Sequence, residues 1–123
     1  MTPLRRILVV DDEAQIRRVM RSVLGAQGYE VIEAECGESA LKLINSGKYD
    51  LILLDVNMPG ISGIEVCREV RTISDIPIII MSAGDEGRAR ALEVGANDYL
   101  KKPFGTSQIF SCVKSNLTHD PEF

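Results

Sequence analysis

Several polar side chains in this sequence have chemistry that fits together. Asp11 and Asp12 stand side by side, Asp55 and Ser82 each follow an apolar run, and Lys102 precedes a proline. Carboxylates held close together repel one another unless a cation shares the site, and oxygen ligands favour Mg²⁺, or alternatively Mn²⁺, over softer metals. A lysine ammonium can pair with phosphate oxygens, and a serine hydroxyl can donate to them. These residue types predict a phosphoryl site that holds a divalent cation.

These side chains meet only if the apolar runs beside them belong to one sheet. Runs of strand length occur at residues 7–10, 29–34, 50–55, 76–81 and 98–100. Between them, apolar residues three or four positions apart predict helices at 14–24, 38–46, 63–72, 88–94 and 106–117. Glycines follow the first, second and fourth of these helices, where they favour helix termination. The sequence therefore predicts a (βα)₅ chain of the α/β class.

The third and fourth apolar runs indicate how the strands are arranged. LILL and IPIII are apolar at consecutive positions, as in inner strands that are buried on both faces. This pattern predicts a doubly wound parallel sheet with five strands. Because ligand sites in such sheets lie beyond the carboxyl ends of the strands, the polar residues that end or follow the strands should converge on one edge.

Length and composition favour one domain without a membrane span. The chain has 123 residues, 45% of them hydrophobic and 26% charged, and no apolar run approaches the roughly 20 residues of a membrane span. MTPLRR leads directly into a strand-like run without an apolar signal core, so we expect a cytoplasmic protein. We expect a single domain over 1–123, with a core at about 5–117 and a tail at 118–123. His119 in that tail is assigned no role.

Charge and cysteine usage exclude other classes. The net charge of −4 argues against nucleic-acid binding by this segment, because phosphate binding requires clustered lysine and arginine. No membrane association is expected either. Cys36, Cys67 and Cys112 are odd in number and far apart, which fits neither a disulfide framework nor a zinc site. We interpret them as reduced thiols that mostly serve in packing.

The acidic residues also fit other structural and functional roles. Aspartate and serine after strands are also common as helix caps and turn residues, so any one position has a structural explanation. A flavin or dinucleotide site would offer glycine-rich or hydroxyl-bearing loops after the first strand, whereas DDE repels phosphate without a metal. The occurrence of suitable residues at successive strand ends favours carboxylate chemistry.

The motifs ILVVDDE, LLDVNMPGISG, IIIMSAG and DYLKKPF resemble the receiver domains of two-component response regulators, over roughly residues 6–117. The resemblance implies a flavodoxin-like sheet with strand order 2-1-3-4-5. It implies a signalling phosphoacceptor that receives a phosphoryl group on Asp55 from a histidine kinase, and not an enzyme. A haloacid dehalogenase type of phosphatase would instead carry a DxD motif after the first strand and a cap domain. An interaction-only pseudo-receiver, independent of phosphorylation, stays open as the alternative.

The same resemblance assigns the metal ligands. Asp11 and Asp12 match the acidic pair that holds Mg²⁺ beside Asp55, and the backbone carbonyl of Asn57 matches the third protein ligand. Met58, Pro59, Gly60 and Gly63 match the loop that follows the phosphoacceptor in these domains.

It also assigns the residues that respond to the phosphoryl group. Ser82 matches the hydroxyl that moves to bond this group, and Lys102, before a cis Pro103, matches the lysine that pairs with it. Tyr99 matches an aromatic switch that turns inward, although a half-buried packing aromatic would look the same in sequence.

The end of the chain resembles the subfamily whose receivers carry winged-helix DNA-binding domains. In that subfamily the dimer interface is formed by the fourth helix, the fifth strand and the fifth helix. We call the surface of these three elements the output face. Gln108 and Cys112 stand where charged partners for Arg88 and Asp98 are expected, so any homodimer should be weak or atypical. The glycines in GDEGRARALEVGA also predict a fourth helix that is short or begins late. A DNA-binding effector domain would lie outside this chain.

Overall fold

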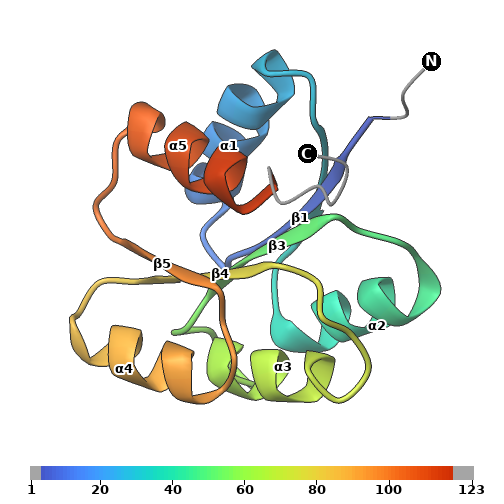
Figure 1. Ribbon diagram of the computed structural model, residues 1–123, viewed down its shortest axis with the longest axis vertical. Helices are drawn as coiled ribbons and strands as arrows, with labels where there is room; N and C mark the ends of the chain where they lie inside the picture. Colours follow the sequence, from blue (N-terminus) through green and yellow to red (C-terminus); the bar gives the residue numbers. More distant parts are fainter. Residues whose placement is uncertain (1–3, 118–123) are drawn as a thin grey trace.

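The computed structural model describes residues 4–117, apart from the side chain of Glu86, and contains a five-stranded parallel sheet (Figure 1). The strands follow the spatial order β2-β1-β3-β4-β5, which confirms the predicted 2-1-3-4-5 sheet. Their bounds are β1 Arg6–Val10, β2 Glu30–Ala34, β3 Leu51–Asp55, β4 Ile78–Ser82 and β5 Asp98–Lys101. The predicted tail at 118–123, with His119, lies outside the described residues.

Helices follow each strand and cover both faces of the sheet. They are α1 Ala14–Ala26, α2 Gly37–Ser46, α3 Gly63–Val70, α4 Glu86–Glu93 and α5 Thr106–Leu117. Figure 1 shows α1 and α5 on one face and α2, α3 and α4 on the other. Between residues 4 and 117, no helix has both the length and the apolar character that a membrane crossing requires.

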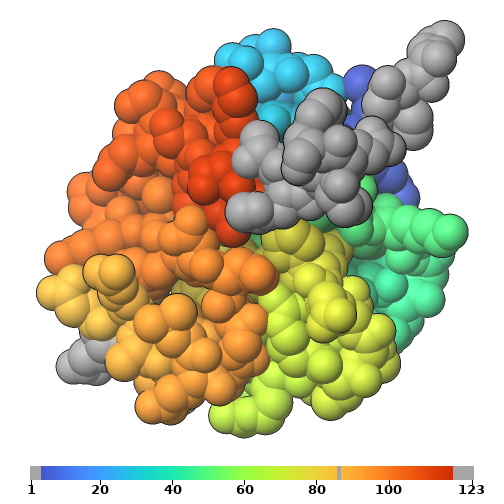
Figure 2. Space-filling model, in the orientation of Figure 1, coloured from blue at the N-terminus to red at the C-terminus, as the bar shows by residue number. Residues whose placement is uncertain are grey.

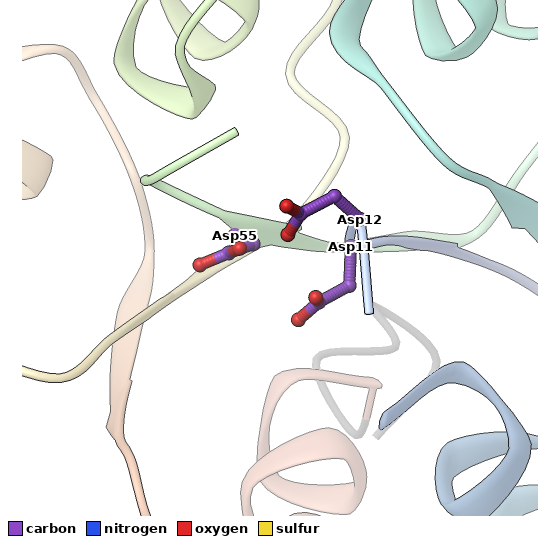
Figure 3. Close-up of side chains that lie close together, drawn as sticks. All are labelled: Asp11, Asp12 and Asp55. Carbon is purple, nitrogen blue, oxygen red and sulfur yellow. The ribbon is translucent and has the colours of Figure 1, made fainter. Parts of the chain in front are cut away.

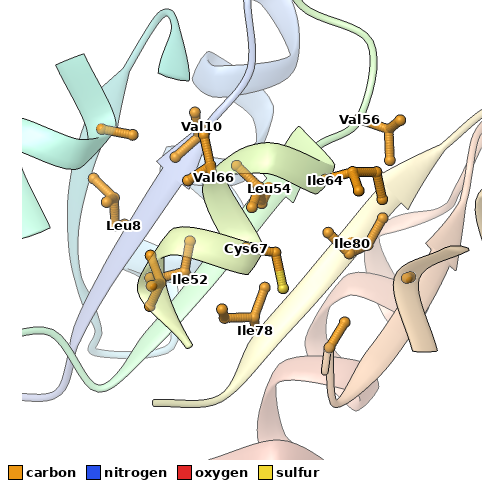
Figure 4. Close-up of a cluster of buried hydrophobic side chains, with 14 of the residues drawn as sticks. Leu8, Val10, Ile52, Leu54, Val56, Ile64, Val66, Cys67, Ile78 and Ile80 are labelled. Atoms are coloured by element: carbon orange, nitrogen blue, oxygen red, sulfur yellow. The ribbon is translucent and has the colours of Figure 1, made fainter. Parts of the chain in front are cut away.

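The side chains of each inner strand alternate between two cores. Ile7 and Val9 pack with α1 and α5, whereas Leu8 and Val10 pack with α2 and α3. Figure 4 shows the second of these cores, with strand side chains lying against α3. Because both faces are covered, β3 and β4 are buried at every position, as their consecutive apolar residues predict.

The helix and strand ends differ slightly from the predicted bounds. Helix α1 continues to Ala26, and Gly28, with φ +92°, turns the chain while Tyr29 N–H donates to the Leu24 carbonyl. Strand β4 begins at Ile78 because Pro77 has no N–H for the strand ladder, although its carbonyl accepts from Ile52. Helix α4 is short, as predicted, but begins at Glu86 rather than late.

Candidate functional site

The predicted site residues lie together at the carboxyl edge of the sheet. Asp11 and Asp12 directly follow β1, and Asp55 is the last residue of β3. Carboxylate oxygens of these three aspartates lie within 4.8 Å of one another (Figure 3). Asp11 is fully buried and Asp55 is 3% exposed, whereas Asp12 is exposed to solvent. The site is therefore acidic, mostly buried and open on one side.

Lys102, which follows β5, reaches into this acidic cluster. Its Nζ atom lies 3.0 Å from Asp11 Oδ2 and 3.3 Å from Asp55 Oδ1. Its backbone N–H donates to the carbonyl of Ser82, which ties the loop after β5 to the end of β4. The bond to Pro103 is cis, as the resemblance implies. Neighbouring Lys101 is exposed and pairs with Asp85, so Lys102 alone of the two enters the site.

The burial of these charges changes their acid–base behaviour. Burial and the charge of Asp11 raise the pKa of Asp55 to about 6, although Lys102 and a backbone hydrogen bond from Asn57 lower it. Burial by itself lowers the pKa of Lys102, but Asp11 and Asp55 together outweigh burial and raise it. Lys102 thus stays an ammonium that only partly compensates the carboxylates.

The acidic cluster fits a hard divalent cation. Its donor atoms are all oxygens, and burial and the charge of Asp11 raise the pKa of Asp55 despite the neighbouring ammonium of Lys102. The exposed side of Asp12 leaves room for the water ligands that Mg²⁺ retains in proteins. Asp11, Asp12 and Asp55 can therefore hold such an ion.

Ser82, which ends β4, and Tyr99, in β5, both form hydrogen bonds at the loop between β4 and α4. The Oγ atom of buried Ser82 accepts a hydrogen bond from Gly84 N–H at 3.4 Å. The Tyr99 hydroxyl donates to the Gly84 carbonyl and, at 3.4 Å, to the Ser82 carbonyl. Asn57 lines a cavity of about 140 Å³ together with Ser82 and Gly84. The residues predicted to respond to a phosphoryl group are thus coupled through the loop between β4 and α4.

The loop after β3 depends on two glycines. Gly60 has φ +80°, a conformation that L side chains rarely adopt. A Cβ atom on Gly63 would lie 2.1 Å from the carbonyl oxygen of Asp55, so this position admits no side chain without moving the backbone. Gly63 therefore allows α3 to begin directly beside the acidic residue.

Some residues beside the site were not found from the sequence. A Cβ atom on Gly87 would lie 2.7 Å from Ser82 Oγ, so this glycine makes room for the serine. Arg17 donates to the Asp11 carbonyl at 2.7 Å and pairs with Glu33. An arginine in an amphipathic helix looks like any solvent-facing residue, and no spacing pattern marks it.

Residues 7–114 match the response regulator receiver domain. The chain belongs to this family. Its match spans both strand ends that carry the aspartates and the loop that carries Lys102, so the whole acidic site lies within the family domain. This receiver domain is a signalling phosphoacceptor and not a catalytic enzyme, as expected from the motifs.

Individual relatives agree with the family assignment. The transcriptional regulatory protein ResD of Bacillus subtilis is 46% identical over 114 residues, which are 91% of this chain and 48% of ResD. The receiver therefore spans about half the length of that curated relative.

Solved structures show the same fold. The response regulator TrrA from Thermotoga maritima, in complex with Mg²⁺-BeF, is 43% identical with a TM-score of 0.86, covering 93% of this chain and all of its own. Chemotaxis protein CheY4 of Vibrio cholerae is 32% identical with a TM-score of 0.88, covering 94% of this chain and all of its own.

Proposed function

We propose that Asp55 is the phosphoacceptor of this receiver domain and that Lys102 and Ser82 assist the transfer. The observation that carries the proposal is the position of Lys102 Nζ, within 3.3 Å of Asp55 Oδ1 and 3.0 Å of Asp11 Oδ2. This geometry places a fixed positive charge beside the one buried carboxylate that ends a central strand. An arriving phosphoryl group would find a nucleophile and a charge partner already in place.

Asp55 Oδ would attack the phosphorus atom while the bond from phosphorus to the donor nitrogen or oxygen breaks. The ionised form of Asp55 is the nucleophile, and its pKa of about 6 leaves it largely ionised at neutral pH. Lys102 would pair with a phosphoryl oxygen as negative charge gathers there. Each of these steps uses a group that already lies at the carboxyl edge of the sheet.

We propose that Asp11, Asp12, Asp55 and the backbone carbonyl of Asn57 hold Mg²⁺, with Mn²⁺ as an alternative. When bound, the ion would neutralise charge on the transferring phosphoryl oxygens. The protein supplies the carboxylates, and Lys102 holds that of Asp11. Asp12 is exposed to solvent, so water can reach the ion from that side. The complex of TrrA with Mg²⁺-BeF supports this assignment by similarity.

Phosphorylation should act through the loop between β4 and α4. A phosphoryl group brings a charge of about −2 and strong acceptor oxygens, and Ser82 Oγ is the nearest hydroxyl from β4. If Ser82 moves to donate to that group, its hydrogen bond with Gly84 breaks, and the loop carbonyls that hold the Tyr99 hydroxyl shift. Tyr99 would then turn inward and alter the output face. In Figure 2 the atoms of α4, β5 and α5, coloured orange to red, form a continuous surface at the left.

A histidine kinase is the proposed phosphoryl donor. An apolar hollow of about 420 Å³ lies beside the acidic site, between α1 and the loop after β5. Such a hollow gives a partner apolar surface to bury next to Asp55. Its lining residues are Ile16, Val19, Ala83, Lys102, Pro103 and Phe104.

The wider context of the domain is also a proposal. We infer a cytoplasmic single domain with its core at about 5–117, which regulates transcription through a DNA-binding effector outside this chain, in line with the similarity to ResD. Direct nucleic-acid contact by this acidic domain is not proposed, since its net charge is −4.

Any homodimer through the output face should be weak or atypical. Asp98 Oδ2 is occupied within the chain, at 2.9 Å from Asn116 Nδ2 and 3.5 Å from Cys112 Sγ. Gln108 Oε1 likewise accepts from Gly105 N–H at 2.7 Å. Asp98 and Gln108 therefore already have partners within the chain.

The test is mass spectrometry after treatment with acetyl phosphate and Mg²⁺. The chain should gain one phosphoryl group, and Asp55→Asn should lose this adduct because an amide cannot act as the nucleophile. Asp75→Asn is the matched control, since Asp75 is an exposed aspartate at the opposite edge of the sheet. An adduct that survives in Asp55→Asn would place the acceptor elsewhere.

The pseudo-receiver alternative makes a different prediction in the same experiment. It expects no adduct in the unchanged chain with either acetyl phosphate or a kinase, in spite of a folded domain. Excess chelator tests the metal assignment separately. The proposed mechanism requires the cation, so equal phosphorylation with and without chelator would contradict the assigned Mg²⁺ site.

A further inference from the structure

Arg17 contacts the acidic loop from outside the set of predicted site residues. It lies in the second turn of α1, and its Nη1 atom donates to the backbone carbonyl of Asp11 at 2.7 Å. Its Nε atom donates to Glu33 Oε1 at 3.1 Å, and its side chain is only 15% exposed. One guanidinium thus joins α1, β2 and the loop that carries two aspartates.

The other polar groups of Asp11 have their own partners. Its N–H donates to the Ala34 carbonyl at 3.2 Å, and Oδ1 accepts from Glu13 N–H at 2.9 Å. Lys102 holds Oδ2 at 3.0 Å. The bond from Arg17 completes this set, because it holds the carbonyl that the other contacts leave open.

The carbonyl of Asp11 belongs to the peptide plane that leads to Asp12. Because a peptide unit is planar, a hydrogen bond that fixes this carbonyl also fixes the orientation of the Asp12 N–H and Cα. The Asp12 side chain is exposed, so its direction depends on the backbone that carries it (Figure 3). Holding the plane therefore fixes the Asp12 Cα and restricts the directions in which its side chain can point.

Glu33 compensates part of the positive charge that Arg17 brings beside the acidic cluster. One of its oxygens lies 3.1 Å from Arg17 Nε and the other pairs with exposed Arg21, so the two arginines share one negative charge. Glu33 also fixes the fork of the guanidinium, which leaves Nη1 aimed at the loop.

We propose that Arg17, held by Glu33, is a positioning residue for the metal ligand Asp12. The inference rests on the proposed function, since it assumes that Asp12 binds the cation. Its immediate consequence concerns metal affinity rather than the phosphoryl transfer itself, because Arg17 reaches the loop backbone and not the phosphoacceptor.

The experiment compares Arg17→Gln with Arg21→Gln in the complete chain. Arg21 pairs with the other oxygen of the same Glu33 at 3.1 Å but is 69% exposed and does not bond the Asp11 carbonyl. Mn²⁺ binding is measured from the free-ion signal in electron paramagnetic resonance, on samples that circular dichroism shows to be folded. Arg17→Gln should weaken Mn²⁺ binding roughly tenfold, as is typical for groups that orient metal ligands, and Arg21→Gln should leave it nearly unchanged.

Two further measurements separate positioning from a general loss of structure. Arg17→Lys keeps the charge but cannot donate through a fork to both Glu33 and the carbonyl, so it should also weaken Mn²⁺ binding. Phosphorylation of Arg17→Gln by acetyl phosphate should be slow at low Mg²⁺ and return to the normal rate at saturating Mg²⁺. A rate that stays low at saturation would overturn the proposal.

Asp12→Asn distinguishes this inference from the proposed function. If Asp12→Asn weakens Mn²⁺ binding and Arg17→Gln does not, or if Arg21→Gln weakens it equally, the positioning role is refuted while the metal site stands. If Asp12→Asn leaves Mn²⁺ binding unchanged, the assignment of the metal ligand fails and the inference fails with it.

Discussion

The buried carboxylate of Asp55 should destabilise the metal-free domain at neutral pH, and Asp55→Asn tests this. Burial and the charge of Asp11 raise the pKa of Asp55 from 3.8 to about 6. Each pKa unit corresponds to about 1.36 kcal/mol, so the ionised form costs the folded state about 3 kcal/mol. Asparagine resembles the protonated carboxyl in shape and carries no charge. We therefore expect the variant to be more stable than the unchanged chain by up to about 3 kcal/mol at pH 7.5.

The sign of the pH dependence follows from the direction of the shift. Because the folded-state pKa of Asp55 lies above the unfolded value, the folded chain holds its proton over a range in which the unfolded chain has released it. The cost of ionisation is thus absent below about pH 4, grows between about pH 4 and 6, and is complete above that range. The stability difference between the two chains should fall to about half at pH 5.

Urea unfolding followed by circular dichroism measures this difference, since the chain contains no tryptophan. Titrations run in chelator at pH 7.5 and pH 5, with Asp75→Asn as an exposed control that should change the free energy of unfolding little. Saturating Mg²⁺ should narrow the gap by stabilising the unchanged chain more than Asp55→Asn. The electrostatic reasoning is wrong if the unchanged chain and Asp55→Asn have the same free energy of unfolding at pH 7.5 in chelator. It is also wrong if the difference between their free energies of unfolding does not vary with pH.

Further predictions concern the glycines beside the site and the output face. Gly63→Ala should lower the free energy of unfolding by at least about 2 kcal/mol, because the added Cβ atom meets the Asp55 backbone. Gly25→Ala, in an open part of α1, should raise the free energy of unfolding by up to about 1 kcal/mol. Urea titrations compare the two variants, and equal effects would contradict the steric argument. Gly87→Ala should strengthen beryllofluoride binding, measured by calorimetry, because its Cβ atom crowds the unligated position of Ser82 Oγ; weaker binding would mean that Ser82 does not move toward the ligand. Light scattering with Mg²⁺ and beryllofluoride should find a monomer or a weak dimer, and a tight dimer cross-linked through α4, β5 and α5 would refute the expectation from Asp98.

Much of the fold could be predicted because the sequence patterns that indicate it are local. Consecutive apolar residues in LILL and IPIII indicated strands that are buried on both faces, and the structure buries every residue of β3 and β4. Strand ends were informative for a related reason: in a parallel sheet all carboxyl ends share one edge. The convergence of Asp11, Asp12 and Asp55 therefore follows from their places after β1 and in β3.

Helix ends were less accurate because they depend on contacts outside the helix. The pattern RARALEV marked the apolar period of α4, but its start at Glu86 places Gly87 in the first turn, against Ser82. The advantage of glycine at that point comes from a neighbour on β4. Intrinsic propensity, which disfavours glycine in helices, carries no information about that neighbour.

The sequence by itself determined the elements, the acidic residues and the lysine, because residue type and periodicity record which positions are buried and which chemistry is available. Only the tertiary structure decided that Lys102 Nζ lies between Asp11 and Asp55, across 91 residues of chain from Asp11, and that burial raises the pKa of Asp55. The bond from Arg17 to the Asp11 carbonyl is of the same kind. Distances, burial and the orientation of a peptide plane depend on which segments pack against each other, and packing between distant segments leaves no regular pattern along the chain.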